Sequence, residues 1–80
     1  MKNIVGPRIR NARLQRGNRI SQEELAARLQ ALGVDLDQGA ISRIENGDRQ
    51  VTDIEVLGVC LALGISMNDL FEGTELPQQT

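Results

Sequence analysis

The chain has 80 residues, 40% of them hydrophobic, and a net charge of −2 at pH 7, which predicts one small domain whose core is marginal unless the chain self-associates. One cysteine and no histidine exclude an internal disulfide, a Cys/His metal cluster and Ser/His or Cys/His catalytic pairs, so we expect no enzymatic activity, no metal and no cofactor. Because no apolar run reaches about 18 residues and the basic N-terminus lacks an apolar signal segment, we expect a cytoplasmic protein without a membrane span.

The first two predicted helices are delimited by glycine, proline and capping residues. The first begins at Gly6, because the proline that follows fits a first turn, where its missing N–H has no helical partner. Gly17 is its predicted end. Ser21 and Glu24 have the spacing of a capping box and begin the second helix, which ends at Gly33. One apolar stripe runs along that helix and consists of Leu25, Ala26, Leu29 and Leu32.

Three further helices follow at short intervals. Asp37 is the predicted N-cap of the third, which ends at Gly47. A second capping box at Thr52 begins the fourth helix, and Gly64 ends it. A short fifth helical turn is predicted to begin at Ser66. The chain is therefore predicted to be an all-α, five-helix domain.

The domain is expected to occupy residues 1–73, with a flexible tail over residues 74–80. No run of alternating apolar and polar residues bounded by hairpin dipeptides indicates a strand. Cys60 lies in an apolar run near acidic residues, so we interpret it as a small buried hydrophobe rather than a reactive thiol. The predicted core consists of Ile9, Ala12, Leu25, Ala26, Leu29, Ile41, Ile44, Leu57, Cys60, Leu63 and Leu70.

The outward face of the third helix carries only polar or small side chains. Each residue of an α-helix advances by about 100°, so one arc of about 140° holds five residues. They are Gln38, Gly39, Ser42, Arg43 and Asn46. Glutamine and arginine side chains can bond bidentately to adenine and guanine edges in the major groove. The pattern favours contact with double-stranded DNA, with an ordinary solvated surface helix as the alternative.

Four segments follow one another in a characteristic order: SQEELA from residue 21, ISRIENG from 41, VTDIEVLGVCLALGIS from 51 and NDLF from 68. In this order they resemble the phage-repressor, or XRE-type, helix-turn-helix DNA-binding domain, from about residue 6 to residue 71. The resemblance implies a λ-repressor-like fold. It also implies sequence-specific binding of double-stranded DNA by a transcriptional regulator, most often a repressor that acts by steric occlusion.

The resemblance also implies individual contacts. Gln22, which follows the cap Ser21 at the start of the second helix, is expected to contact a phosphate, and helix N-termini favour anions. A solvated glutamine is the alternative. Base edges are expected to be contacted by Gln38, Gly39, Ser42 and Arg43. For Arg43 the alternative is a surface ion pair with an acid such as Asp48.

Further positions match the family in part. Asn46 matches a position that contacts the DNA backbone, while Arg13 and Glu45 match a buried structural ion pair between the first and third helices. The connection between the second and third helices is several residues longer than in the family, where about 3–4 residues are usual, so the recognition helix is expected to be displaced or tilted. Arg19 belongs to an apparent insertion, and either approaches a phosphate or only lengthens a loop.

The fourth helix is apolar on two sides, which raises the question of a partner. One of its stripes repeats at helical spacing and consists of Ile54, Gly58, Leu61 and Ile65. We expect a homodimer through this stripe, with the two recognition helices about 34 Å apart, one turn of DNA. The alternative is that the tail or the fifth helix covers Leu61.

Charge leaves a second function open. Residues 1–22 hold six basic and no acidic side chains, whereas residues 50–80 hold five acidic and no basic ones. A pI near 5.0 is unusual for a DNA-binding domain. DNA binding therefore requires the N-terminal arginines to lie beside the recognition helix. The alternative is an antitoxin or anti-repressor, a protein-binding module of the same fold.

Overall fold

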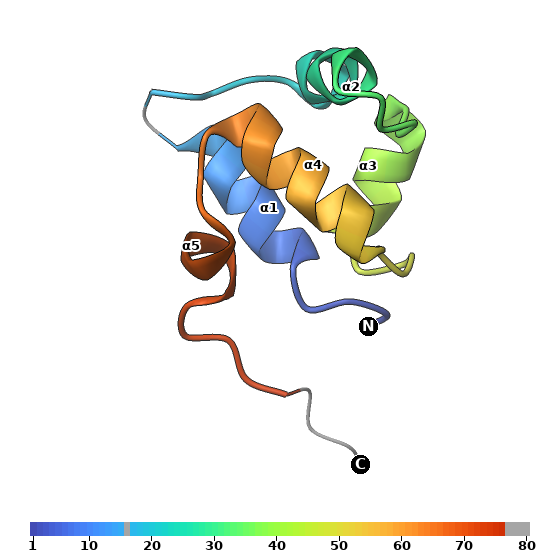
Figure 1. Ribbon diagram of the computed structural model, residues 1–80. Coiled ribbons are helices and arrows are strands. Elements are labelled where there is room, and N and C mark those ends of the chain that lie inside the picture. Colours follow the sequence, from blue (N-terminus) through green and yellow to red (C-terminus); the bar gives the residue numbers. More distant parts are fainter. Residues whose placement is uncertain (16, 77–80) are drawn as a thin grey trace.

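Five helices make up the fold of the computed structural model, which describes residues 1–15 and 17–76. They are α1 (Gly6–Leu14), α2 (Gln22–Ala31), α3 (Gln38–Glu45), α4 (Asp53–Leu63) and α5 (Met67–Phe71). α1 and α4 lie at the centre, with α2 and α3 on one side of them and α5 on the other (Figure 1). The predicted all-α, five-helix architecture is confirmed. Within the described ranges, no helix has the length and apolar character needed to cross a bilayer.

The helix starts follow the predicted caps. The Ser21 side chain accepts a hydrogen bond from the Glu24 backbone N–H at 3.0 Å, but among the described residues the return bond from the Glu24 carboxylate is not formed, so only half of that capping box exists. The box between Thr52 and Glu55 is complete. Gly64 ends α4 in the left-handed conformation, with φ at +69°, where a β-carbon would add strain.

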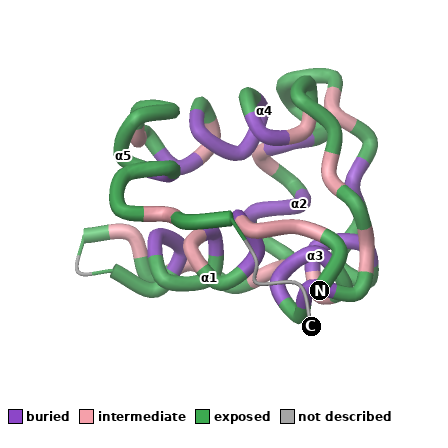
Figure 2. Tube along the Cα trace, turned by 90° about the horizontal axis from the view of Figure 1, so that it is seen from below, coloured by how far each residue is buried: buried purple, intermediate pink, exposed green. Residues whose placement is uncertain are grey.

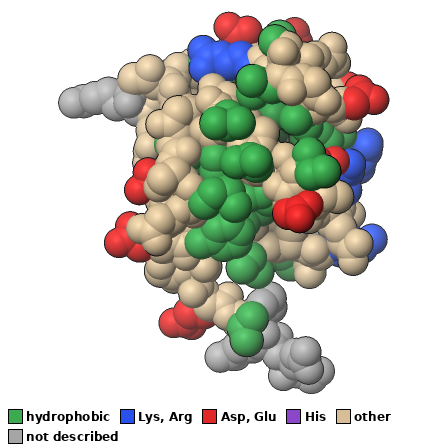
Figure 3. Space-filling view, viewed as in Figure 1, with side chains coloured by type: hydrophobic (Ala, Val, Ile, Leu, Met, Phe, Trp, Pro, Cys, Tyr) green, Lys and Arg blue, Asp and Glu red, His purple; other side chains and the backbone are tan. Residues whose placement is uncertain are grey.

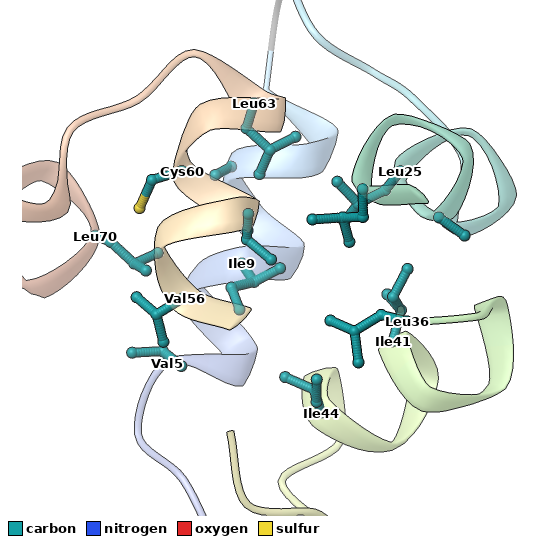
Figure 4. Packing of buried hydrophobic residues seen from close by; sticks show 14 of the residues in the cluster. Val5, Ile9, Leu25, Leu36, Ile41, Ile44, Val56, Cys60, Leu63 and Leu70 are labelled. Carbon is teal, nitrogen blue, oxygen red and sulfur yellow. The ribbon is translucent and has the colours of Figure 1, made fainter. Parts of the chain in front are cut away.

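The core draws apolar side chains from all five helices, as Figure 4 shows. Buried and exposed stretches alternate along α1 and α4 (Figure 2). One prediction was wrong: Leu57 is 50% exposed, because Val56, Val59 and Cys60 face the interior instead and Leu57 lies outside their arc. Buried hydrophobic residues absent from the predicted core are Val5, Leu36, Ala40, Val56 and Val59.

The long connection between α2 and α3 is packed onto the core. Leu36 is fully buried, and the backbone N–H of Val34 donates to the carbonyl of Leu29 at 2.9 Å. The Val34 side chain covers Gly58 of α4: a β-carbon at Gly58 would lie 2.8 Å from Val34 Cγ2 and 3.2 Å from Leu29 Cδ2. The additional residues are thus anchored by Val34 and Leu36.

The connection between α1 and α2 is anchored in a similar way. The Asn18 side-chain amide donates to the carbonyl of Leu63 at 3.0 Å, so this segment satisfies a carbonyl at the end of α4. Arg19 has φ at +39°, an uncommon conformation for a residue with a β-carbon. Of the expected tail, residues 77–80 lie outside the described part.

Candidate nucleic-acid interface

The outer side of α3 forms the surface that the sequence singled out. We call it the recognition face, and its residues are Gln38, Gly39, Ser42, Arg43 and Asn46. All are exposed except Ser42, which is half-buried. The opposite side of α3 is held in the core by Ala40, Ile41 and Ile44. Asp37 caps the helix by accepting the backbone N–H of Ala40 at 2.8 Å. The helix is therefore fixed from behind and open toward solvent.

A buried ion pair fixes α3 against α1. Arg13 donates from Nε to Glu45 Oε2 at 2.8 Å and from Nη2 to Glu45 Oε1 at 2.9 Å, and both residues are buried. The hydrogen bonds that Arg13 donates to the Glu45 carboxylate raise the pKa of Arg13, and burial offsets part of that rise. A third bond from Arg13 Nη1 reaches the carbonyl of Ile20 at 2.9 Å. The structural pairing implied by the resemblance is present.

From this ion pair a chain of hydrogen bonds leads to the recognition face. Gln22 Nε2 donates to Glu45 Oε1 at 3.0 Å, and Gln38 Nε2 donates to Gln22 Oε1 at 3.0 Å. The half-buried Gln22 is thus bonded on both sides, which differs from the alternative of a freely solvated glutamine. Gln38 retains its Oε1 acceptor and a second Nε2–H, which is the pair of groups that an adenine edge can meet.

Arg43 extends back along α3 toward its N-terminal end. A β-carbon at Gly39 would lie 3.7 Å from Arg43 Nη1 and 3.5 Å from Asp37 Oδ1, so the guanidinium passes over the glycine. In residues 1–15 and 17–76 no ion pair involves Arg43. Asp48, the partner proposed in the alternative, donates its backbone N–H to the Arg43 carbonyl at 2.9 Å instead. The Arg43 guanidinium faces solvent.

The N-terminal arginines only partly meet the charge requirement. Arg8 donates to the carbonyls of Leu70 and Glu72 at α5, and Arg13 is used in the buried ion pair. Further along the chain, Arg28 donates to the carbonyl of Ala62. Figure 3 shows basic side chains, with acidic ones among them, along the edge of the molecule where α3 lies. Much of the basic charge is thus used in contacts that stabilise the fold, and is not gathered along the edge where α3 lies.

The residues expected at a dimer interface lie in different environments. Ile54 and Leu61 are 70% and 62% exposed, so neither α5 nor the described part of the tail covers Leu61. Gly58, expected at the dimer interface, is instead buried beneath Val34, whose methyl group fills the space beside it. Ile65 is half-buried against the core. Leu57 is exposed like Ile54 and Leu61, and Figure 3 shows an apolar strip over α4.

One basic residue near α3 was not predicted from the sequence. Lys2 belongs to the N-terminal segment and lines a cleft together with Arg43 and Arg49. The run from Asn3 to Val5 is too short to assign to a helix or strand from the sequence. No local pattern indicates the hydrogen-bond partners of Asn3, which lie more than 40 residues away. An exposed lysine close to the recognition face was therefore missed.

Comparison with known proteins gives one match. A family model described as Helix-turn-helix matches residues 9–70, a span that contains α1 from Ile9, α2, α3 and α4. Comparisons with curated proteins and with solved structures found no match. The matched span includes both ends of the hydrogen-bond chain from Arg13 to Gln38 as well as the entire recognition face.

Proposed function

Because this chain belongs to the helix-turn-helix family of DNA-binding regulators, we propose that it is a sequence-specific transcriptional repressor that binds its operator through α3 and occludes the promoter. The observation that carries this proposal is the exposed recognition face, on which Gln38 is oriented by Gln22 and Arg43 is free of an ion pair in the described residues. A helix whose inner side is packed in the core and whose solvent-facing side is polar suits insertion into the major groove.

Base recognition is assigned to four residues. Gln38 offers a donor and an acceptor to adenine, and Arg43 offers two donors to guanine O6 and N7; each such pair discriminates by about 1–3 kcal/mol. Gly39 and Ser42 are small, which allows the helix backbone to approach the bases closely. The sequence preference of the protein thus depends mainly on Gln38 and Arg43.

Backbone contacts are assigned to residues around the recognition face. Ser21 and Gln22 lie at the N-terminus of α2, where free N–H groups and the helix dipole favour a phosphate. Asn46 lies just after α3, and Arg19 is exposed on the connection before α2. Because Gln22 also bonds Gln38, a phosphate at α2 would fix the position of the base-reading amide.

Self-association is proposed through the outer stripe of α4, which we redefine as Ile54, Leu57 and Leu61. The spacing of these residues places them on one side of the helix, and each is at least half exposed. A small domain of 80 residues gains stability when such apolar side chains are covered by a second copy. Two recognition faces about 34 Å apart would then contact successive turns of DNA.

The test is selection of bound duplexes from a random pool. The proposal predicts a palindromic consensus, because two copies related by a twofold axis bind two half-sites. Arg43→Ala is expected to relax the preference at one G·C position while the fold, followed by circular dichroism, stays intact. A pool without sequence enrichment would overturn the proposal.

A second candidate is a protein-binding module of the same fold, such as an antitoxin or anti-repressor that binds a basic partner. Its support is the acidic pI of 5.0 and the five acidic side chains of residues 50–80, a segment whose sequence contains no basic residue. Duplex binding separates the two candidates. A DNA-binding regulator enriches a sequence in the selection, and its affinity for duplexes falls steeply as salt rises. The protein-binding module would show no sequence preference in the selection.

A further inference from the structure

The N-terminal segment is attached to the end of α3 by several hydrogen bonds. The backbone N–H of Lys2 donates to the carbonyl of Gly47 at 2.8 Å. The Asn3 side-chain amide donates to the carbonyls of Ile44 at 3.1 Å and Arg49 at 2.8 Å. Its Oδ1 accepts the backbone N–H of Gly6. The segment is therefore a fixed part of the surface that follows α3.

This attachment places Lys2 in a cleft beside the recognition face. The cleft is lined by Lys2, Arg43, Asp48, Arg49, Gln50 and Thr52. Arg49 is paired with Glu55 at 2.9 Å, so its charge is compensated. Lys2 is exposed, and no ion pair in residues 1–15 and 17–76 involves it. Because the Arg43 guanidinium extends back over Gly39, Lys2 supplies the cation for this cleft, and Asp48 supplies a carboxylate.

The cleft lies at the C-terminal end of α3, because Lys2 is bonded to Gly47, two residues beyond the last residue of the helix. Gln22 at the start of α2 bonds both Gln38 and Glu45, the first and last residues of α3. Eight helical residues span roughly 12 Å. The major groove is about 12 Å wide, with a phosphate backbone on each side. When α3 occupies the groove, a group at each of its ends can face one of the two backbones.

We propose that this cleft is a second backbone-binding site that takes a phosphate of duplex DNA beside the C-terminal end of α3. Lys2 is its principal ligand, and Asn3 is a positioning residue that holds Lys2 in place. The inference rests on the proposed DNA-binding function and adds to it a contact from a segment that precedes the residues matched by the family model.

Lys2→Gln tests the site through the salt dependence of DNA affinity. One lost phosphate contact lowers the slope of log affinity against log salt by about 0.9. Between 50 and 200 mM salt, the variant should therefore lose roughly 3.5-fold less affinity than the unmodified chain. The loss of affinity at low salt should be similar on the selected operator and on an unrelated duplex, because phosphates carry no sequence.

Two further variants separate a charge effect from a structural one. Lys2→Arg keeps the cation and should retain the salt slope. Asn3→Ala should reduce the slope as Lys2→Gln does, and combining the two should reduce it no further. Should Asn3→Ala fail to fold, the exposed Lys2 variants still decide the question. An unchanged slope in Lys2→Gln overturns this site while leaving the proposed function standing, whereas a random pool without enrichment overturns the function itself.

Discussion

The side-chain amides of Gln22 and Gln38 are joined by a hydrogen bond of 3.0 Å between residues of α2 and α3. Gln22 is fixed in turn by Glu45, which is paired with the buried Arg13. In the proposed complex, Gln22 contacts a phosphate and Gln38 contacts a base. The two contacts are therefore expected to depend on each other, because one amide orients the other.

A double-mutant cycle measures this dependence. Gln22→Ala and Gln38→Ala should each weaken operator binding, and the double variant should lose less than the product of the two single losses, with a coupling of at least about 0.5 kcal/mol. Gln30→Ala, an exposed glutamine on the same helix as Gln22, is the matched control and should show no coupling with Gln38→Ala. Purely multiplicative losses would contradict the linkage.

The contact between Gly58 and Val34 should limit what residue 58 can be. Alanine normally favours a helix over glycine by up to ~1 kcal/mol, but here its β-carbon meets the Val34 methyl group, and overpacking costs about 1–3 kcal/mol. Gly58→Ala should therefore lower the free energy of unfolding in urea. In a Val34→Ala background the same change should be much less costly. Equal effects in both backgrounds would show that Val34 does not restrict this position.

The bond between Arg49 and Glu55 gives stability a defined dependence on pH. The guanidinium of Arg49 lowers the pKa of Glu55, with a smaller contribution from the Thr52 backbone. A carboxyl group with a lowered folded-state pKa stabilises the fold above its unfolded value, about 4.3, and loses that contribution as the pH falls through the folded-state pKa. Glu55→Gln should therefore destabilise the chain near neutral pH, and the difference from the unmodified chain should shrink in acid. A difference independent of pH would contradict this assignment.

Replacement of Leu61 tests self-association through the outer stripe of α4. Leu61→Glu should shift sedimentation to the monomer and weaken operator binding, because a charge at an apolar contact is not compensated. The domain itself should stay folded, since Leu61 is 62% exposed. Leu14→Glu changes an exposed leucine of α1 and should leave both measurements unchanged. A monomeric unmodified chain, with operator binding unaffected by Leu61→Glu, would remove the dimer.

The helices and the recognition face were predictable because their determinants are local. Asp37, Thr52 and Ser66 each accept a backbone N–H only three residues ahead. The exposed side of α3 follows from the angular spacing of its residues alone. Two local predictions differ from the described residues: α1 ends at Leu14 and not at Gly17, and the return bond of Glu24, which depends on one exposed side chain, does not form.

The remaining features depend on contacts between distant residues. α4 is apolar on two sides, so its sequence could not show whether Leu57 or Val56 faces the core. Val34, in a connection of unusual length, packs on Gly58 of the same helix, and no local pattern of either segment indicates that contact. Asn3 reaches carbonyls 41 and 46 residues away, which no local pattern encodes.

The central claim is that the recognition face reads DNA bases, and it is tested most directly by measuring how Arg43→Ala changes the discrimination at each operator position. Affinities are measured for the selected operator and for every single base-pair substitution, with both the unmodified chain and the variant. We expect a G·C position whose substitution costs the unmodified chain about 5- to 150-fold, and costs the variant almost nothing. Equal penalties for both proteins at every position would contradict base recognition by Arg43.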